Sequence, residues 1–160
     1  MTDQTTSKVS PMSPQERNTY VALICNLLIN GYAIIQLRSM FAQGLLDGPD
    51  APQVWARMIV WVILAAIALT IVLTILFNVV FAIATGDKTP SFLSDERDKM
   101  FEVRAMGMTT FIMVAAFLGC IIALALGYSA LTAFLVLYFG MAAGSLAGDF
   151  VKLASYRHGG

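Results

Sequence analysis

The stretch "VWARMIVWVILAAIALTIVLTILFNVVFAIA", residues 54–84, is a long apolar run with a single charged residue, Arg57. A helix needs about 20 consecutive apolar residues to cross the hydrocarbon layer of a bilayer. The run is longer than that, so it predicts a membrane-spanning helix that tilts or projects from the bilayer. Arg57 lies one turn inside its start and can extend its side chain outward to the interface. Trp55 and Trp61 fit the aromatic belt found there.

Three further apolar runs flank this one: "YVALICNLLINGYAIIQL" at 20–37, "MGMTTFIMVAAFLGCIIALAL" at 106–126 and "ALTAFLVLYFGMAAGSLAG" at 130–148. The turn signals "DGPD" at 47–50 and "GYS" at 127–129 separate neighbouring runs. The sequence therefore predicts an all-α protein, an integral membrane four-helix bundle. We expect a disordered tail over 1–17, a membrane domain over 18–155 and a short tail over 156–160. The predicted spans are 19–38, 54–84, 95–127 with its extension beyond the bilayer, and 129–152.

Composition excludes several classes of protein. Hydrophobic residues make up 58% of the chain and charged residues 12%, about half the charged share of a soluble domain. The net charge is zero, so the chain lacks the excess of basic residues typical of a nucleic-acid binder. No direct contact with nucleic acid is therefore expected. Cys25 and Cys120 lie in separate apolar runs without the spacing of a metal or redox site, and no cofactor is expected.

The distribution of lysine and arginine predicts the orientation. Four spans place both termini and the loop between the second and third spans on one side. That side carries eight of the ten basic residues, and the opposite loops carry only Arg38 and Arg57. Because positively charged flanks stay inside, the termini and the central loop are predicted to be cytoplasmic.

Much of the charge lies in "TPSFLSDERDKMFEVRAMGMTT", residues 89–110. Ser94 is a good N-cap, and the acidic residues after it suit the positive end of a helix dipole. One helix is expected to begin at Asp95 and to run into the third span without a break. Two interpretations stay open: a solvated helix start that anchors the span, or a docking surface for a cytoplasmic protein. The candidate partner-binding residues are Asp95, Glu96, Arg97, Asp98, Glu102 and Arg104.

The segment "SDERDKMFEVRAMGM", residues 94–108, resembles the signature of small uncharacterised bacterial four-helix integral membrane proteins. In these, "DERD" precedes an acidic residue, a basic residue and small residues that lead into the third span. The matching positions here are Asp95, Glu96, Arg97, Asp98, Glu102, Arg104 and Ala105. The four-span layout is similar along most of the chain. Such proteins are often encoded beside helix-turn-helix regulators. The resemblance therefore implies a protein of the bacterial inner membrane that tethers or antagonises a transcription factor, and it implies no catalytic residue.

Polar residues interrupt two of the spans at helical spacing. Asn26 and Asn30 are one turn apart in the first span, and Thr74 and Asn78 are one turn apart in the second. If the two helices are antiparallel neighbours, their depths would let Asn26 face Asn78 and Asn30 face Thr74. These side chains are either interhelical hydrogen-bonding residues or the lining of a small polar cavity for a ligand.

The fourth span carries Gly140, Gly144 and Gly148. Glycines at every fourth position let two helix backbones approach closely. The neighbour is either another span of the same chain or the same helix of a second copy in a homodimer. Asp149 follows at the membrane boundary, where Lys152 and Arg104 are candidate ion-pair partners.

Three functions are weighed. The first is a non-enzymatic signalling or interaction component that binds a cytoplasmic protein through residues 87–105. The second is a small oligomeric transporter or channel, which the polar stripes favour, although no ionisable residue is found in the middle of a span. The third, an enzyme acting on lipid, lacks a visible acid, base or nucleophile.

Overall fold

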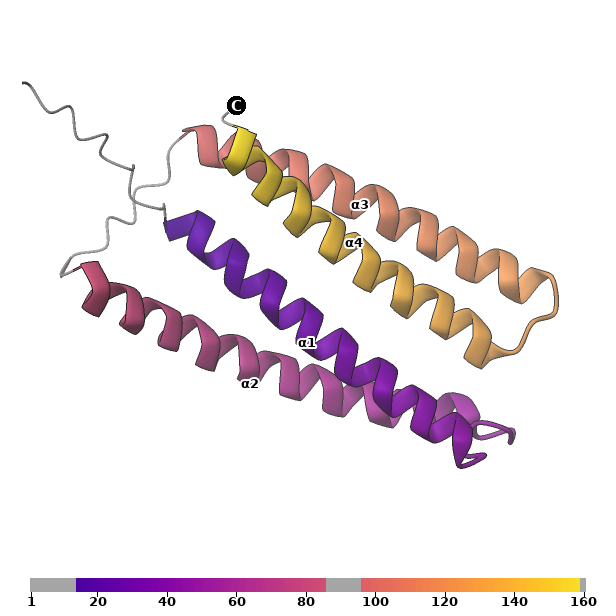
Figure 1. Ribbon diagram of the computed structural model, residues 1–160. Helices are drawn as coiled ribbons and strands as arrows, with labels where there is room; N and C mark the ends of the chain where they lie inside the picture. The colour runs from indigo at the N-terminus through magenta and orange to yellow at the C-terminus, as the bar shows by residue number, and fades with distance from the viewer. Residues whose placement is uncertain (1–13, 86–95, 159–160) are drawn as a thin grey trace, which may run out of the picture.

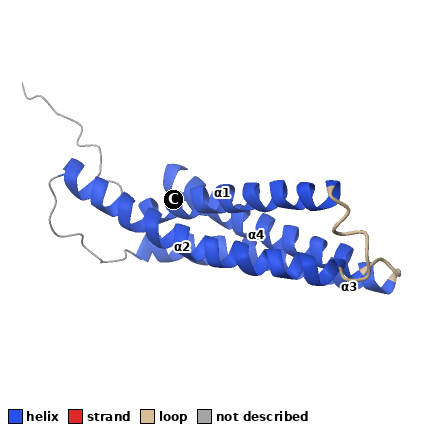
Figure 2. Cartoon of the chain, turned by 90° about the horizontal axis from the view of Figure 1, so that it is seen from below, coloured by secondary structure: helices blue, strands red, loops and turns tan. Residues whose placement is uncertain are grey.

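A computed structural model describes residues 14–85 and 96–158, which form four α-helices and, within these ranges, no strand (Figures 1 and 2). They are α1 (Pro14–Ala42), α2 (Ala51–Thr85), α3 (Glu96–Ala125) and α4 (Ala130–His158). Each is long and apolar enough to cross a membrane. The prediction of an all-α chain with four such helices is confirmed. The N-terminal tail before Pro14, the segment 86–95 with Asp95, and residues 159–160 lie outside the described residues.

Three helices extend beyond the predicted spans: α2 begins three residues early, at Ala51, and α1 and α4 extend further. α1 begins at Pro14 rather than near residue 19, because proline suits the first helical position and Glu16 faces the positive end of the dipole. α4 continues through Arg157 and His158 instead of ending near residue 152. A positive side chain in the last turn, here Arg157, stabilises the negative end of a helix, which favours this extension.

The short connections are fixed by glycines with positive φ. At the end of α1, Gly44 has φ 68° and the amide of Leu45 donates to the carbonyl oxygen of Met40. At the end of α3, Gly127 has φ 83° and the amide of Tyr128 donates to the carbonyl oxygen of Ala123. Both are helix-terminating turns that glycine adopts without a steric penalty. The adjacent helices are therefore antiparallel hairpins.

The four helices lie side by side in the order α3, α4, α1, α2 (Figure 1). α4 packs closely along α3 and also on α1, whereas α3 has no other close neighbour among the described helices. The start of α1, the end of α2, the start of α3 and the end of α4 all lie at one end of the molecule. We call this the terminal end, and the opposite end, with the two short turns, the turn end.

The largest buried cluster lies at the turn end and joins α1, α2, their connection and α4 through Leu37, Met40, Leu46, Ala51, Trp55 and Leu131. Trp55 is only 3% exposed and makes an edge-to-face contact with Tyr138, at a centroid distance of 5.5 Å. Its ring therefore fills the space between α2 and α4, and its place at the membrane interface stays a prediction. Trp61 is 72% exposed, as a lipid-facing or interfacial side chain would be.

Candidate functional site

The charged start of α3 presents most of its side chains outward. Glu96, Arg97, Glu102 and Arg104 are exposed, whereas Asp98 is only 8% exposed. Within the described ranges, none of the five forms an ion pair with another described residue. The four exposed side chains are therefore accessible to a partner, whereas the buried Asp98 is not. Asp95 lies outside the described residues.

Phe101 holds this segment against the end of α4. Its ring is 1% exposed and meets Tyr156 edge to face at a centroid distance of 5.2 Å. The guanidinium carbon of Arg97 lies 5.3 Å from the centre of the same ring, which is within the range of a cation–π contact. One aromatic side chain thus anchors the helix start and fixes which of its faces remains open.

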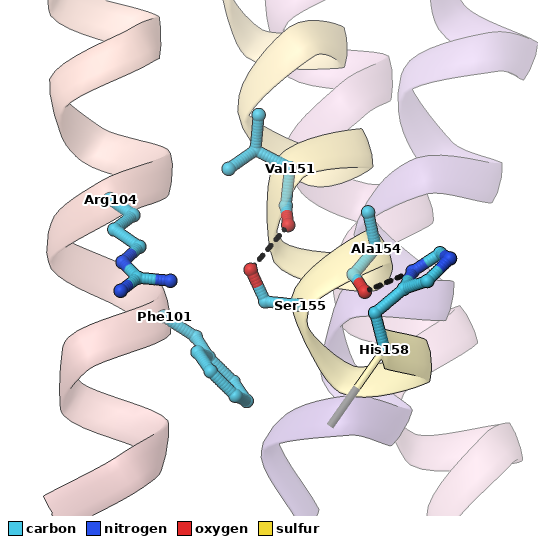
Figure 3. A pocket seen from close by; sticks show the side chains of 6 residues that line it. All are labelled: Phe101, Arg104, Val151, Ala154, Ser155 and His158. Atoms are coloured by element: carbon cyan, nitrogen blue, oxygen red, sulfur yellow. Dashed lines mark hydrogen bonds between the residues drawn. The ribbon is translucent and has the colours of Figure 1, made fainter. Parts of the chain in front are cut away.

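Two shallow hollows meet at Arg104. The first, the Arg104 groove, lies between α3 and α4, has a volume of about 450 Å³ and is lined by Phe101, Arg104, Val151, Ala154, Ser155 and His158 (Figure 3). The second lies on α3, has a volume of about 320 Å³ and is lined by Lys99, Met100, Val103 and Arg104. In Figure 3 the Arg104 guanidinium extends toward α4, while the His158 ring lies on the other side of the α4 backbone. His158 Nδ1 donates to the carbonyl oxygen of Ala154.

A polar cluster joins α1 to α4. The Asn26 side-chain amide donates to Ser145 Oγ at 3.0 Å and to a carboxylate oxygen of Asp149. One turn further along α1, Asn30 Oδ1 accepts a hydrogen bond from the Tyr138 hydroxyl at 3.3 Å. The Asn30 amide donates to the backbone oxygen of Asn26. All five side chains are half-buried, so the cluster is an interhelical network with access to its surroundings.

The structure does not bring Asn26 to Asn78, nor Asn30 to Thr74. Asn78 is exposed on α2, and its amide donates to the backbone oxygen of Thr74 in its own helix. Depth along an antiparallel pair of helices does not determine how each helix is rotated about its axis. Here α1 turns its asparagines toward α4, where Asp149 and Ser145 offer acceptors, and α2 turns Asn78 outward.

The three glycines of α4 face α3. A methyl group on Gly140 would overlap Ala116, and one on Gly148 would overlap the Thr109 side chain. At Gly144 it would lie 3.1 Å from the backbone oxygen of Thr109. The glycines thus pack against another helix of the same chain, α3, rather than against a second copy in a homodimer.

Comparison of the chain with protein-family models, curated proteins and solved structures finds no match. The site must therefore be interpreted from its own geometry. Sequence reasoning missed Ser145, Asp149 and Tyr138 as partners of the asparagines. One signal was present: the three residues recur at spacings of seven and four, which places them on one face of α4.

Proposed function

We propose that this protein is a non-enzymatic membrane component that binds a cytoplasmic protein through the exposed charges at the start of α3. The family resemblance suggests that the partner is a transcriptional regulator, which would be tethered or antagonised at the bacterial inner membrane. The observation that carries the proposal is the set of exposed side chains of Glu96, Arg97, Glu102 and Arg104, without ion-pair partners among the described residues.

The position of α3 supports this role. It packs closely on α4 alone, so its outward face is not covered by α1 or α2. Exposed surface charges contribute little to stability, so folding alone does not require this concentration of them. Arrays of charge do set the specificity and the association rate of protein partners.

The experiment compares two triple variants of the full chain, each removing two acids and one base. The first carries Glu96→Ala, Arg97→Ala and Glu102→Ala. The matched control carries Arg38→Ala, Asp47→Ala and Asp50→Ala at the turn end. A soluble protein captured by the wild type is identified by mass spectrometry, purified and titrated against each variant in detergent. We expect the first variant to weaken binding at least tenfold and the control to bind as the wild type does.

Equal binding by both variants, at equal membrane levels, would contradict the proposal. A loss in both would also contradict it, since it would show a response to total charge rather than to this surface. The variants must show the wild-type helical circular dichroism, so that a misfolded chain is not counted as a lost interaction.

One observation favours the alternative of a small oligomeric transporter or channel. Asp149 is an ionisable residue within α4, half-buried and hydrogen-bonded to Asn26 of α1. Ionisable residues that face a neighbouring helix are frequent in ion and proton pathways. Flux of protons or monovalent cations into proteoliposomes, abolished by Asp149→Asn, would support this alternative. If gradients of protons and monovalent cations persist in proteoliposomes that contain the wild-type chain, the transporter or channel alternative is rejected.

A further inference from the structure

The Arg104 groove combines a cation, apolar walls and a place at the membrane boundary. We propose that it binds an anionic phospholipid, with the phosphate on Arg104 and the upper part of the lipid against the apolar walls. This inference goes beyond the proposed partner and does not depend on it.

The sequence of α3 indicates where the groove lies relative to the membrane. No charged residue occurs between Ala105 and Leu126, a length of about 33 Å at 1.5 Å per helical residue. This matches the hydrocarbon layer of ~30 Å. Arg104 is therefore the first charged residue outside the layer, at the level of the lipid phosphates. On the other wall, Val151, Ala154 and Ser155 follow Asp149 on α4 and lie at the same level.

The described charged side chains that line the two hollows are all basic. Among the described residues, Arg104 and His158 are the titratable residues of the first hollow and Lys99 and Arg104 those of the second, and neither hollow is lined by a described acidic side chain. Arg104 forms no ion pair with another described residue, so its guanidinium is available to an external anion. A guanidinium binds two phosphate oxygens at once. Basic pockets between membrane helices are a recurrent mode of anionic headgroup binding.

The walls select a lipid rather than a dissolved anion. Val151 and Ala154 in the first hollow, and Met100 and Val103 in the second, offer apolar surface beside the cation. Phe101 also lines the first hollow, but its ring is buried. Ser155 Oγ donates to the backbone oxygen of Val151, and Figure 3 shows His158 directed away from Arg104. A free phosphate would thus find a single guanidinium and little else in the first hollow. A phospholipid would in addition cover these apolar side chains.

The test is native mass spectrometry of the full chain in detergent, titrated with phosphatidylglycerol or with phosphatidylcholine of the same acyl chains. We expect the wild type to bind phosphatidylglycerol more tightly. Arg104→Gln should lower that affinity about fivefold, the factor that corresponds to one basic residue at an anionic surface. Ala154→Phe, which fills the groove and keeps the charge, should lower it as well. Arg57→Gln removes one cation at the turn end and should leave it unchanged.

Three results would overturn the inference. The first is equal binding of the two lipids by the wild type. The second is an equal loss in Arg57→Gln and Arg104→Gln, which would indicate attraction by total charge. The third is displacement of phosphatidylglycerol by millimolar inorganic phosphate, which would assign the groove to a dissolved anion. If Arg104→Gln loses its helical circular dichroism, Ala154→Phe alone decides. No protein partner is present, so the outcome is separate from that of the capture experiment.

Discussion

At the scale of single residues, Asn26 and Asn78 show how similar side chains take different roles. Asn26 donates to Ser145 and Asp149 of α4, whereas Asn78 is exposed and, among the described residues, bonds only within α2. Both lie in long apolar runs, where an amide without a partner is unfavourable. One amide is satisfied by another helix and the other by its own backbone, so only the first ties two elements together.

Replacing Asn26 should therefore weaken the α1–α4 contact. Asn26→Leu removes the hydrogen bonds to Ser145 and Asp149. We expect a loss of about 1 kcal/mol in the free energy of unfolding, the usual size for an interhelical polar contact in a membrane protein. The measurement is unfolding in mixed micelles followed by circular dichroism. Asn78→Leu is the control and should be neutral; a larger loss there would show that the roles of the two asparagines are exchanged.

A second residue-scale prediction concerns Gly140. A methyl group at this position would overlap the side chain of Ala116 and approach its Cα to 3.2 Å. Gly140→Ala should lower the free energy of unfolding by about 1–3 kcal/mol, because the backbones must separate. Gly107 has no atom within 4 Å of such a methyl group, so Gly107→Ala should be neutral or stabilising. Thermal melts of both variants in the same detergent provide the comparison, and equal melts would contradict the packing.

At the scale of elements, α4 is the helix that joins α3 to α1. Its glycines face α3, and its Tyr138, Ser145 and Asp149 face α1. The glycine stripe and the polar stripe are offset by one residue, about 100° around the helix. α4 thus meets one neighbour by close backbone approach and the other by hydrogen bonds.

The pairing of α3 with α4 can be tested with a native cysteine. Cys120 of α3 is buried in one cluster with Ala133 of α4. In a Cys25→Ser background, Ala133→Cys should give an intrachain disulfide on mild oxidation, seen as a faster band on a non-reducing gel. Val72→Cys on α2 is the control, because α2 has no close packing with α3. Efficient crosslinking from α2 but not from α4 would reject the order of the helices.

At the scale of the whole molecule, the charges divide between two ends. The described basic residues at the terminal end include Arg17, Arg97, Lys99, Arg104, Lys152 and Arg157, whereas the turn end carries Arg38 and Arg57. α1 begins and α4 ends at this same terminal end. In a membrane this arrangement, together with the positive-inside bias, predicts a cytoplasmic terminal end.

Labelling of intact cells with a membrane-impermeant maleimide checks this orientation. In a chain without native cysteines, Asp50→Cys at the turn end should react from outside. Glu96→Cys at the start of α3 should react only after the cells are permeabilised. Both positions are exposed, so a difference reports the side of the membrane rather than burial. Labelling of Glu96→Cys in intact cells would contradict the orientation and with it the proposed cytoplasmic partner.

The sequence by itself determined the helical class, the four apolar segments and the short turns that separate the first from the second and the third from the fourth. Long runs such as 54–84 are too apolar for water, and their backbone groups must pair within each segment. It also identified the glycine ridge and the asparagine stripe as contact surfaces. Helix ends were less well determined, because Pro14 and His158 extend α1 and α4 by local effects outside the apolar runs.

Only the tertiary structure decided which neighbour each surface meets. Lipid tails are as apolar as leucine, so apolar faces in a membrane do not choose one helix over another. Rotation of each helix is set by a few close or polar contacts, such as Gly140 on Ala116 and Asn26 on Asp149. These contacts join residues far apart in the chain, and the period of one helix carries no information about the rotation of the next. For that reason Asn26 meets α4 rather than Asn78, and Arg104 opens onto a groove that the sequence did not indicate.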